Sequence, residues 1–598
     1  MRYLRMFSNA VLAALLGAVY LSVLFLQLNP TVPLYPTILA SLAVTLALSY
    51  GVHFVVVFYA LIVLRQMIAN EALSPGWVSL RLLSWLLAAD AAGVATLMWF
   101  NLRSYAPMLS LETSRRMAAG AAILTACAFT FLGVALAHYS FGRRKGRLGA
   151  SFVGLALAVS LVLPLVARGP GKLQPLVSRP LDIDAIISRA SVGGRVVLIV
   201  LDGGSLDFVS TAALEGRLPS FGKILDSGAA MHLATIRPTQ PDPVWTTVAT
   251  GKLPARTGVR SAARYRVPAT ADSLELLPDN CFAHGLVHFG FISAIPHTSA
   301  SVRARPIWSI LGSAGLTSGV VNWPLTYPAQ PVRGYLVSDQ FYRPGAASLE
   351  PDDPGRELEN AVRSTALSIQ PPELFDAARA AGDAARPEAE ATPLAQHSSS
   401  DPRRDLLQAQ PFITDRMYEQ VARALQERVR PDLSAVRYRG LDVAGHRFLR
   451  YAMPRDFGDV SPEERRRYGQ VLENAYARVD GIVGRALAAL GPDDLLLVVS
   501  GFGMEPLTVG KRMLERYIGD PDLSGSHEDA PDGFMLAFGV AVAPGRKPRA
   551  SVVDVVPTIL YFMGLPVAHD MDGYAVTEVF RREFRDNRPM AFIQTYER

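Results

Sequence analysis

The chain has 598 residues, half of them hydrophobic, and a formal net charge of +6 at pH 7. The charge is uneven, because residues 1–167 hold 11 Lys or Arg but only three acidic residues. A basic surplus confined to an apolar segment is typical of membrane flanks and argues against a nucleic acid partner. The two cysteines, Cys127 and Cys281, lie far apart, which excludes a disulfide framework and a cysteine zinc site.

Five apolar runs in the first part of the chain approach or exceed the roughly 20 residues that cross a bilayer. They cover about 9–28, 35–64, 80–100, 117–140 and 148–167. The second run is counted as one tilted span, because dividing it at Gly51 leaves two pieces that are too short. Residues 1–167 are therefore predicted to form a membrane domain of about five helices in contact with the lipid bilayer.

Basic stretches set the predicted orientation of these spans. "MRYLR" at the N-terminus and "GRRKGR" at 142–147 are expected on the cytoplasmic side. Arg103, Arg115 and Arg116 fall on the opposite side and count against this orientation, but "GRRKGR" outweighs them. Residues 168–598 are then an extracytoplasmic domain, on the periplasmic face of a bacterial inner membrane. Asp90, inside the third run, is either a functional carboxyl or a protonated interhelical group, and we favour the second.

Apolar strands and helical patterns alternate along residues 168–598. "VVLIVLDGG" is a strand with a Gly turn, and 462–491 reads as a long amphipathic helix that leads into the strand "LLLVVSGFG". Residues 237–259 read as a Pro-broken loop. The alternation predicts an α/β domain with a doubly wound, mostly parallel sheet. Residues 368–412, rich in Ala, Pro, Ser and charge, are predicted to be a partly disordered insertion.

Several polar side chains follow predicted strands and are candidate metal ligands. Asp202 ends the first strand, and Asp442 and His446 are four residues apart, so a helical turn places them on one face. His527 precedes another strand. Carboxylate and imidazole together suit a zinc-like ion, although Asp-Gly is also an ordinary turn.

Hydroxyl groups in "PVWTTVATG" are a second set of candidates. Thr246, Thr247 and Thr250 are either nucleophiles or capping and packing groups. For each of them taken singly we favour the second interpretation.

The order of these motifs resembles the type I phosphodiesterase/nucleotide pyrophosphatase branch of the alkaline phosphatase superfamily. The resemblance implies an alkaline phosphatase-like fold in which two zinc-like ions clamp a phosphoryl group and a Ser or Thr attacks it. It implies that Asp442, His446 and His527 bind one ion and that Asp202 binds the other. The motifs are the strand before Asp202, "PVWTTVATG", "VVNWPLTYPAQPVRGYLVSD", "DVAGHRF", "VVSGFGM", "SGSHEDAPDGF" and "DVVPTILYFMGLPVAHDMDG".

Three departures from the family pattern fall at the second ion and the nucleophile. The family has Ser-Asp-His-Gly-Met where this chain has Ser-Gly-Phe-Gly-Met at 500–504. The nucleophile position falls on Pro241, or on Asp242 if the gap shifts by one residue. The family's His-Gly is Thr257 followed by Gly258 here.

The sequence therefore predicts one bound zinc-like ion and a membrane-anchored pseudoenzyme that acts by binding or assembly, with a phosphate- or sulfate-ester ligand. An active one-metal hydrolase or transferase that uses Asp242, Thr246 or Thr247 is the alternative. A third interpretation makes the membrane part the functional one, with the outer domain as its regulator. The sequence specifies no protein partner.

Overall fold

The structure is a computed structural model that describes residues 2–69, 78–141, 146–171, 194–342, 367–391 and 402–597. It divides into two compact units. The first, called the helical unit, comprises Met1–Leu176 and Arg260–Pro296, and the second, called the sheet unit, comprises Val177–Val259 and His297–Arg598.

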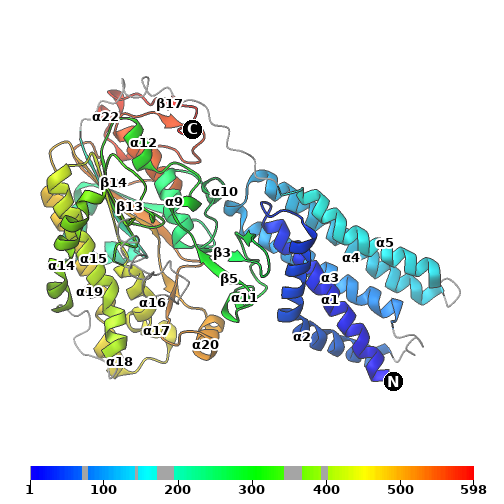
Figure 1. Ribbon diagram of the computed structural model, residues 1–598. Helices are drawn as coiled ribbons and strands as arrows, with labels where there is room; N and C mark the ends of the chain where they lie inside the picture. Colours follow the sequence, from blue (N-terminus) through cyan, green and yellow to red (C-terminus); the bar gives the residue numbers. More distant parts are fainter. Residues whose placement is uncertain are drawn as a thin grey trace, which may run out of the picture. The chain divides into compact units, whose positions relative to one another are not determined.

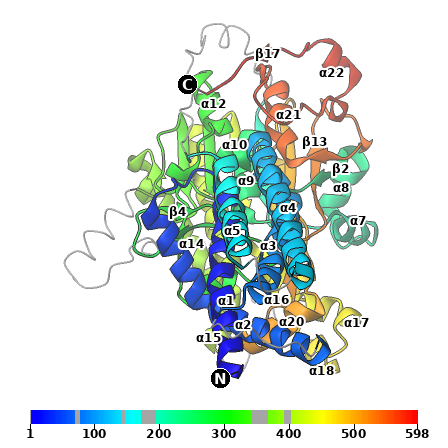
Figure 2. The same cartoon turned by 90° about the vertical axis from the view of Figure 1, so that its right-hand side faces the viewer.

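Five long helices form most of the helical unit, as the sequence predicts. All five are long and apolar enough to cross a membrane. Figure 2 shows α1, α3, α4 and α5 running side by side. The helices are α1 (Arg2–Leu28), α2 (Pro36–Ala69), α3 (Leu80–Ser104), α4 (Leu111–Phe141) and α5 (Gly146–Arg168), with the short η1 (Ala106–Met108) after α3.

The rest of the helical unit is the segment Arg260–Pro296, here called the docked segment. It contains a small antiparallel sheet of β3 (Ala263–Arg266), β4 (Ser273–Leu274) and β5 (Ser293–Pro296), with helix α11 (His284–His288) between β4 and β5.

Side chains at the helix ends hold the backbone of the docked segment. Just after α1, the side-chain amide of Asn29 accepts hydrogen bonds from the N–H groups of Glu275 (2.6 Å) and Leu276 (2.9 Å) and donates one to the Leu276 carbonyl (2.8 Å). Near the end of α3, Asn101 accepts from the Asp279 N–H (2.7 Å) and donates to its carbonyl (3.1 Å). These amides act as substitute strand partners for a segment that lies far away in the sequence.

A ten-stranded mixed sheet forms the centre of the sheet unit, in the order β14-β2-β13-β10-β1-β9-β6-β7-β8, with β15 beside β2. Strands β10, β1, β9, β6 and β7 are mutually parallel, so their carboxyl ends share one edge. The strands are β1 (Val196–Leu201), β2 (Ala229–Ala234), β6 (Ser318–Trp323), β7 (Gly334–Ser338), β8 (Ile369–Gln370), β9 (Leu433–Tyr438), β10 (Leu495–Phe502), β13 (Asp532–Phe538), β14 (Gly545–Arg546) and β15 (Ala550–Ser551).

Helices cover both faces of this sheet, as the predicted α/β fold requires. On one face, side chains of α7, α8, α14, α15, α16 and α19 share a single apolar core with the strands. Helices α9 and α12 lie on the other face (Figure 1). The first group is α7 (Leu206–Leu214), α8 (Pro219–Ser227), α14 (Phe375–Ala391), α15 (Pro402–Val429), α16 (Gly440–Ala452) and α19 (Val471–Ala489), and the second is α9 (Pro241–Thr250) and α12 (Ile307–Ser313).

Shorter elements complete the sheet unit. They are the helices α10 (Pro254–Thr257), α17 (Pro454–Phe457), α18 (Pro462–Tyr468), α20 (Val509–Ile518), α21 (Val555–Phe562) and α22 (Arg582–Asp586), and the paired strands β11 (Glu505–Pro506) with β12 (Gly525–Ser526) and β16 (Val567–Ala568) with β17 (Phe592–Ile593).

Local structure differs from the sequence interpretation in two places. The amphipathic stretch 462–491 is two helices rather than one, because α18 ends at Tyr468 and α19 begins at Val471. Residues 237–259 contain helix α9, whose first residue is Pro241, a position where proline favours a helix start. Within 368–412, the structure describes α14 and the start of α15, while 392–401 lie outside the described residues.

Candidate metal centre

Three predicted ligands meet at the carboxyl edge of the parallel strands. Asp442 and His446 lie one turn apart on α16, which follows β9 directly, and His527 comes just after β12. The Asp442 Oδ1 is 3.5 Å from the His446 Nε2 and 4.0 Å from the His527 Nε2. All three atoms lie within 4.8 Å of one another, a spacing that a single ion can bridge.

Backbone carbonyls orient both imidazoles. The His446 Nδ1 donates to the Gly525 carbonyl (2.8 Å), and the His527 Nδ1 donates to the Thr239 carbonyl (3.1 Å). A carbonyl can only accept, so each Nδ1 carries a proton, and in the neutral ring the Nε2 is the atom left to bind a metal beside Asp442. Metal-bound histidines are oriented by hydrogen bonds of this kind.

Burial of Asp442 and His527 favours the binding of a cation between them. Asp442 is 7 % exposed, and its Oδ1 has no hydrogen-bond partner. Burial is the main cause that lowers the pKa of His527, partly offset by the charge of Asp442, and so favours the neutral, metal-binding form. A buried carboxylate oxygen without a donor, facing two imidazole lone pairs, fits a divalent ion.

A cap holds helix α16 in place. Asp415 of α15 accepts hydrogen bonds from the N–H groups of Arg439 (3.0 Å) and Gly440 (2.7 Å), the residues at which α16 begins. This bond pattern satisfies free N–H groups at the helix start and fixes the turn that carries Asp442. Burial raises the pKa of Asp415 to about 7.

Asp202 lies at the same edge, but an arginine engages it. Arg437, the fifth residue of β9, donates from its Nε to the Asp202 Oδ1 (3.0 Å) and from its Nη2 to the Oδ2. Asp202 is 1 % exposed and Arg437 is 5 % exposed, so the ion pair is shielded from water. Both oxygens of this predicted ligand therefore face a guanidinium.

Apolar packing surrounds residues 501 and 502, where the family has two metal ligands. Phe502, at the end of β10, is fully buried, with its ring centroid 5.0 Å from that of His527 and 6.0 Å from that of Trp245. A Cβ placed on Gly501 would lie 2.6 Å from a methyl carbon of Val244. The chain thus offers neither a ligand nor free space at 501 and 502.

Helix α9 carries the nucleophile candidates. The Thr246 hydroxyl donates to the backbone carbonyl of Asp242 (2.6 Å), and Thr247 is fully buried. Pro241 begins the helix and has no nucleophilic group. Burial raises the pKa of the Asp242 carboxyl to about 6, against the opposing charge of Arg437.

A comparison with protein families gives one match, to type I phosphodiesterase/nucleotide pyrophosphatase, over residues 196–558. This match spans more than half of the chain. The chain belongs to this family. A search of curated protein sequences finds no match.

Solved structures of ectonucleotide pyrophosphatase/phosphodiesterase 5 also align with this chain. The murine protein, an inactive variant in complex with AMP, is 13 % identical, with a TM-score of 0.34. The human protein is 14 % identical, with a TM-score of 0.34. Each alignment covers 65 % of this chain and all of the other. Scores this low add nothing to the family assignment.

Sequence reasoning missed several residues of this phosphodiesterase-family site. Arg437, Asp339, Asn322 and Asp415 all lie near the carboxyl edge, and none was a candidate. Arg437 could have been found, because it is a charged residue in the middle of an apolar sequence, "LSAVRY", that forms a buried strand. A buried arginine needs a carboxylate partner, and that requirement points to the strand ends.

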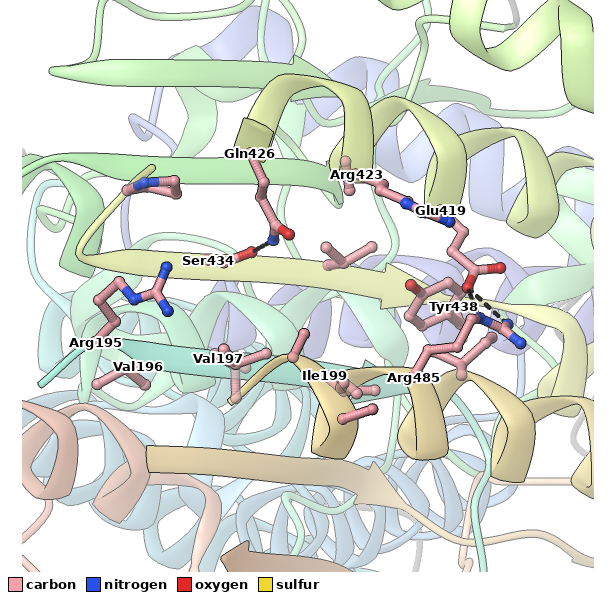
Figure 3. Close-up of a pocket in the computed structure, with 18 of the residues that line it drawn as sticks. Arg195, Val196, Val197, Ile199, Glu419, Arg423, Gln426, Ser434, Tyr438 and Arg485 are labelled. Carbon is pink, nitrogen blue, oxygen red and sulfur yellow. Dashed lines mark hydrogen bonds and ion pairs between the residues drawn. The ribbon is translucent and has the colours of Figure 1, made fainter. Parts of the chain in front are cut away.

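A separate pocket of about 460 Å³ lies between the same sheet and the helices α15 and α19. Figure 3 shows Val197 and Ile199 of β1 on its floor and Gln426 of α15 above them. Glu419 and Arg485 close one end with an ion pair (2.6 Å). None of the metal-centre residues lines this pocket.

Proposed function

We propose that this membrane-anchored phosphodiesterase-family protein binds one zinc-like ion and acts by binding a ligand rather than by two-metal hydrolysis. The convergence of Asp442, His446 and His527 carries the proposal. Three protein ligands would leave the fourth position of a tetrahedral ion open to a ligand oxygen. When bound, the ion supplies a Lewis acid that polarises a phosphoryl or sulfuryl oxygen. A phosphate or sulfate ester is the ligand class that this chemistry and the family favour.

The surroundings of the three ligands support binding over turnover. Two-metal hydrolysis needs two ions about 3.5–4 Å apart, on either side of the reacting group. Asp202 is already paired with Arg437, and Phe502, an apolar residue, is buried beside His527. The Thr246 hydroxyl is committed to a helix carbonyl. These groups would bind and orient a ligand without offering it a hydroxyl nucleophile.

A one-metal hydrolase or transferase is the second candidate, and Asp242 favours it. This carboxyl lies in the first turn of α9, and burial raises its pKa to about 6. General acid–base groups work best when their pKa lies near the working pH. Asp242 would then move a proton to or from the ligand.

The test uses the full-length chain in detergent, with metal content measured by mass spectrometry and turnover measured on aryl phosphodiesters and aryl sulfates. We expect one equivalent of zinc and turnover far below about 1 per second, an ordinary enzymatic rate. Asp442→Asn should remove the zinc, whereas Asp456→Asn, at an exposed site on α17, should not. Turnover near 1 per second that Asp442→Asn abolishes would establish the second candidate instead. Two equivalents of zinc would refute the one-ion proposal.

We also propose that the sheet unit faces away from the cytoplasm, in a bacterial cell the periplasm. One of the three arginines that count against this orientation, Arg116, has a structural role beside Arg168. Arg168 donates to the carbonyls of Leu26 (2.6 Å) and Asn29 (2.6 Å) at the end of α1, and Arg116 donates to the Arg168 carbonyl (2.9 Å). A reporter enzyme that works only outside the cytoplasm, fused after Arg598, should be active. Activity of a cytoplasmic reporter at that position would contradict the orientation.

A further inference from the structure

Arg437 is a permanently charged group inside the sheet. All six residues of β9 are buried, and Arg437 is the only charged one among them. Its guanidinium binds both oxygens of Asp202 in a fork. Arginine stays protonated under all ordinary conditions, so this positive charge cannot be removed by a shift in pH or by a chelator.

This guanidinium contacts one carboxylate, that of Asp202, and two further carboxyl groups act on its charge without contacting it. Besides Asp202, the charges of Asp339 and Asp242 act on it through space. Asp339 follows β7, and its Oδ1 is buried without a hydrogen-bond partner. Asn322 donates from its side chain to the Arg437 carbonyl (2.9 Å) and so holds this part of β9 in place.

Divalent cations are ordinarily bound by carboxylate oxygens, but both oxygens of Asp202 are bound here by a guanidinium. We infer that the Arg437 guanidinium is a built-in cation, which takes the place of a second metal ion at Asp202 and limits the centre to one exchangeable ion. An ion at Asp202 would face a positive charge at hydrogen-bonding distance from the same oxygens, and such repulsion is strong away from water. The inference rests on the proposed function for the first ion only.

The residues of this chain therefore differ from the family's metal ligands at the site of the second ion. The resemblance assigns Asp202 to a second ion, whereas the structure assigns it to Arg437. Gly501 and Phe502 offer no metal-binding side chain, and the Phe502 ring is buried beside His527 and Trp245. The family's second cation is replaced here by a side chain of the protein.

Removing the guanidinium should reveal the replaced site. In Arg437→Met, Asp202, Asp242 and Asp339 lose their common cation, and a hard divalent ion such as Mn²⁺ should enter. In protein saturated with zinc, we expect a second metal equivalent. We also expect the unfolding temperature to rise by about 3 °C at a Mn²⁺ concentration of 100 times its Kd. The wild type should keep one equivalent and should not respond to Mn²⁺.

Arg217→Met is the matched control, because Arg217 also pairs with two carboxylates, Glu215 and Glu473, but at the surface. This control should bind no second ion. An Arg437→Met protein that takes up one equivalent only and ignores Mn²⁺ would overturn the inference. An Arg437→Met protein that folds only when Mn²⁺ is added would support it.

If Arg437→Met does not fold under any condition, the zinc content of Asp202→Asn tests the inference independently. If Asp202 serves Arg437, this variant keeps one zinc equivalent with unchanged affinity. If Asp202 is a metal ligand, the variant loses zinc, and the inference fails. Two zinc equivalents in the wild type would also overturn it. A wild type without any zinc would refute the proposed function alone, since the Mn²⁺ response of Arg437→Met would still test the built-in cation.

Discussion

Gly501→Ala tests whether the packing behind Phe502 excludes a ligand side chain at position 501. The added Cβ would lie 2.6 Å from the Val244 Cγ1 and 3.3 Å from the Trp245 ring. Ordinary contacts between carbon atoms are about 3.5–4.0 Å, so the side chain or strand must move by nearly 1 Å. Overpacking of a buried site typically costs about 1–3 kcal/mol.

The expected effect on thermal unfolding follows from the size of the sheet unit. Unfolding entropy is about 2.1 cal/mol/K per residue, or about 0.8 kcal/mol/K for a unit of about 400 residues. Gly501→Ala should therefore lower the unfolding midpoint by about 1–4 °C, measured by scanning calorimetry of the full-length chain in detergent. In Val244→Ala the facing methyl group is gone, so adding Gly501→Ala to that variant should cost less, which a double-mutant cycle measures.

A matched control separates packing from the general effect of replacing a glycine. Gly510 lies in α20, and a Cβ added there would meet no atom within 4 Å, so Gly510→Ala should leave the midpoint unchanged or raise it slightly. If Gly501→Ala is as stable as the wild type, the space beside Val244 is available. An aspartate at 501 would then be tolerated, and the reasoning about this position would be refuted.

Three further changes test the site and the helical unit. Burial raises the pKa of Asp415 to about 7, so its protonated form stabilises the fold below about pH 4, and this contribution, about 4 kcal/mol, is lost as the pH rises through 7. Asp415→Asn should remove that pH dependence, which unfolding midpoints between pH 4 and 8 will show. His527→Ala should weaken zinc binding by more than about 100-fold in a chelator competition, because loss of a supporting hydrogen bond alone costs about 10–100-fold. Asn29→Ala should leave the N–H groups of Glu275 and Leu276 unpaired, at about 1–3 kcal/mol each, and should speed proteolysis within 260–296.

Local sequence patterns were enough to predict the five long apolar helices and two of the three residues of the metal centre. Apolar runs of sufficient length gave the five helices, including α2 as one continuous helix through Gly51. The four-residue spacing of Asp442 and His446 placed them on one face of α16, because a helix brings such residues together. His527 was a candidate because it precedes a strand, but only the family resemblance joined it to Asp442 and His446, since no local pattern ties it to α16.

The sequence interpretation did not predict contacts between residues that lie far apart in the chain. Arg437 and Asp202 are 235 residues apart, and only the sheet register brings them together. The sequence interpretation predicts a loop at Pro241, whereas in the structure Pro241 is the first residue of α9, a position where proline favours a helix. The contacts of Asn29 with the docked segment span 246 and 247 residues and leave no trace in either local pattern.

The docked segment bears on how the protein is made and how it can be divided. The chain passes between the two units three times, after Leu176, Val259 and Pro296. A fragment that begins after α5 would carry residues 260–296 without the helices that bind them, so the sheet unit cannot be cut away cleanly. During synthesis, α1 to α3 emerge first and already carry Asn29 and Asn101, so the membrane helices provide a template on which a later part of the chain completes its folding.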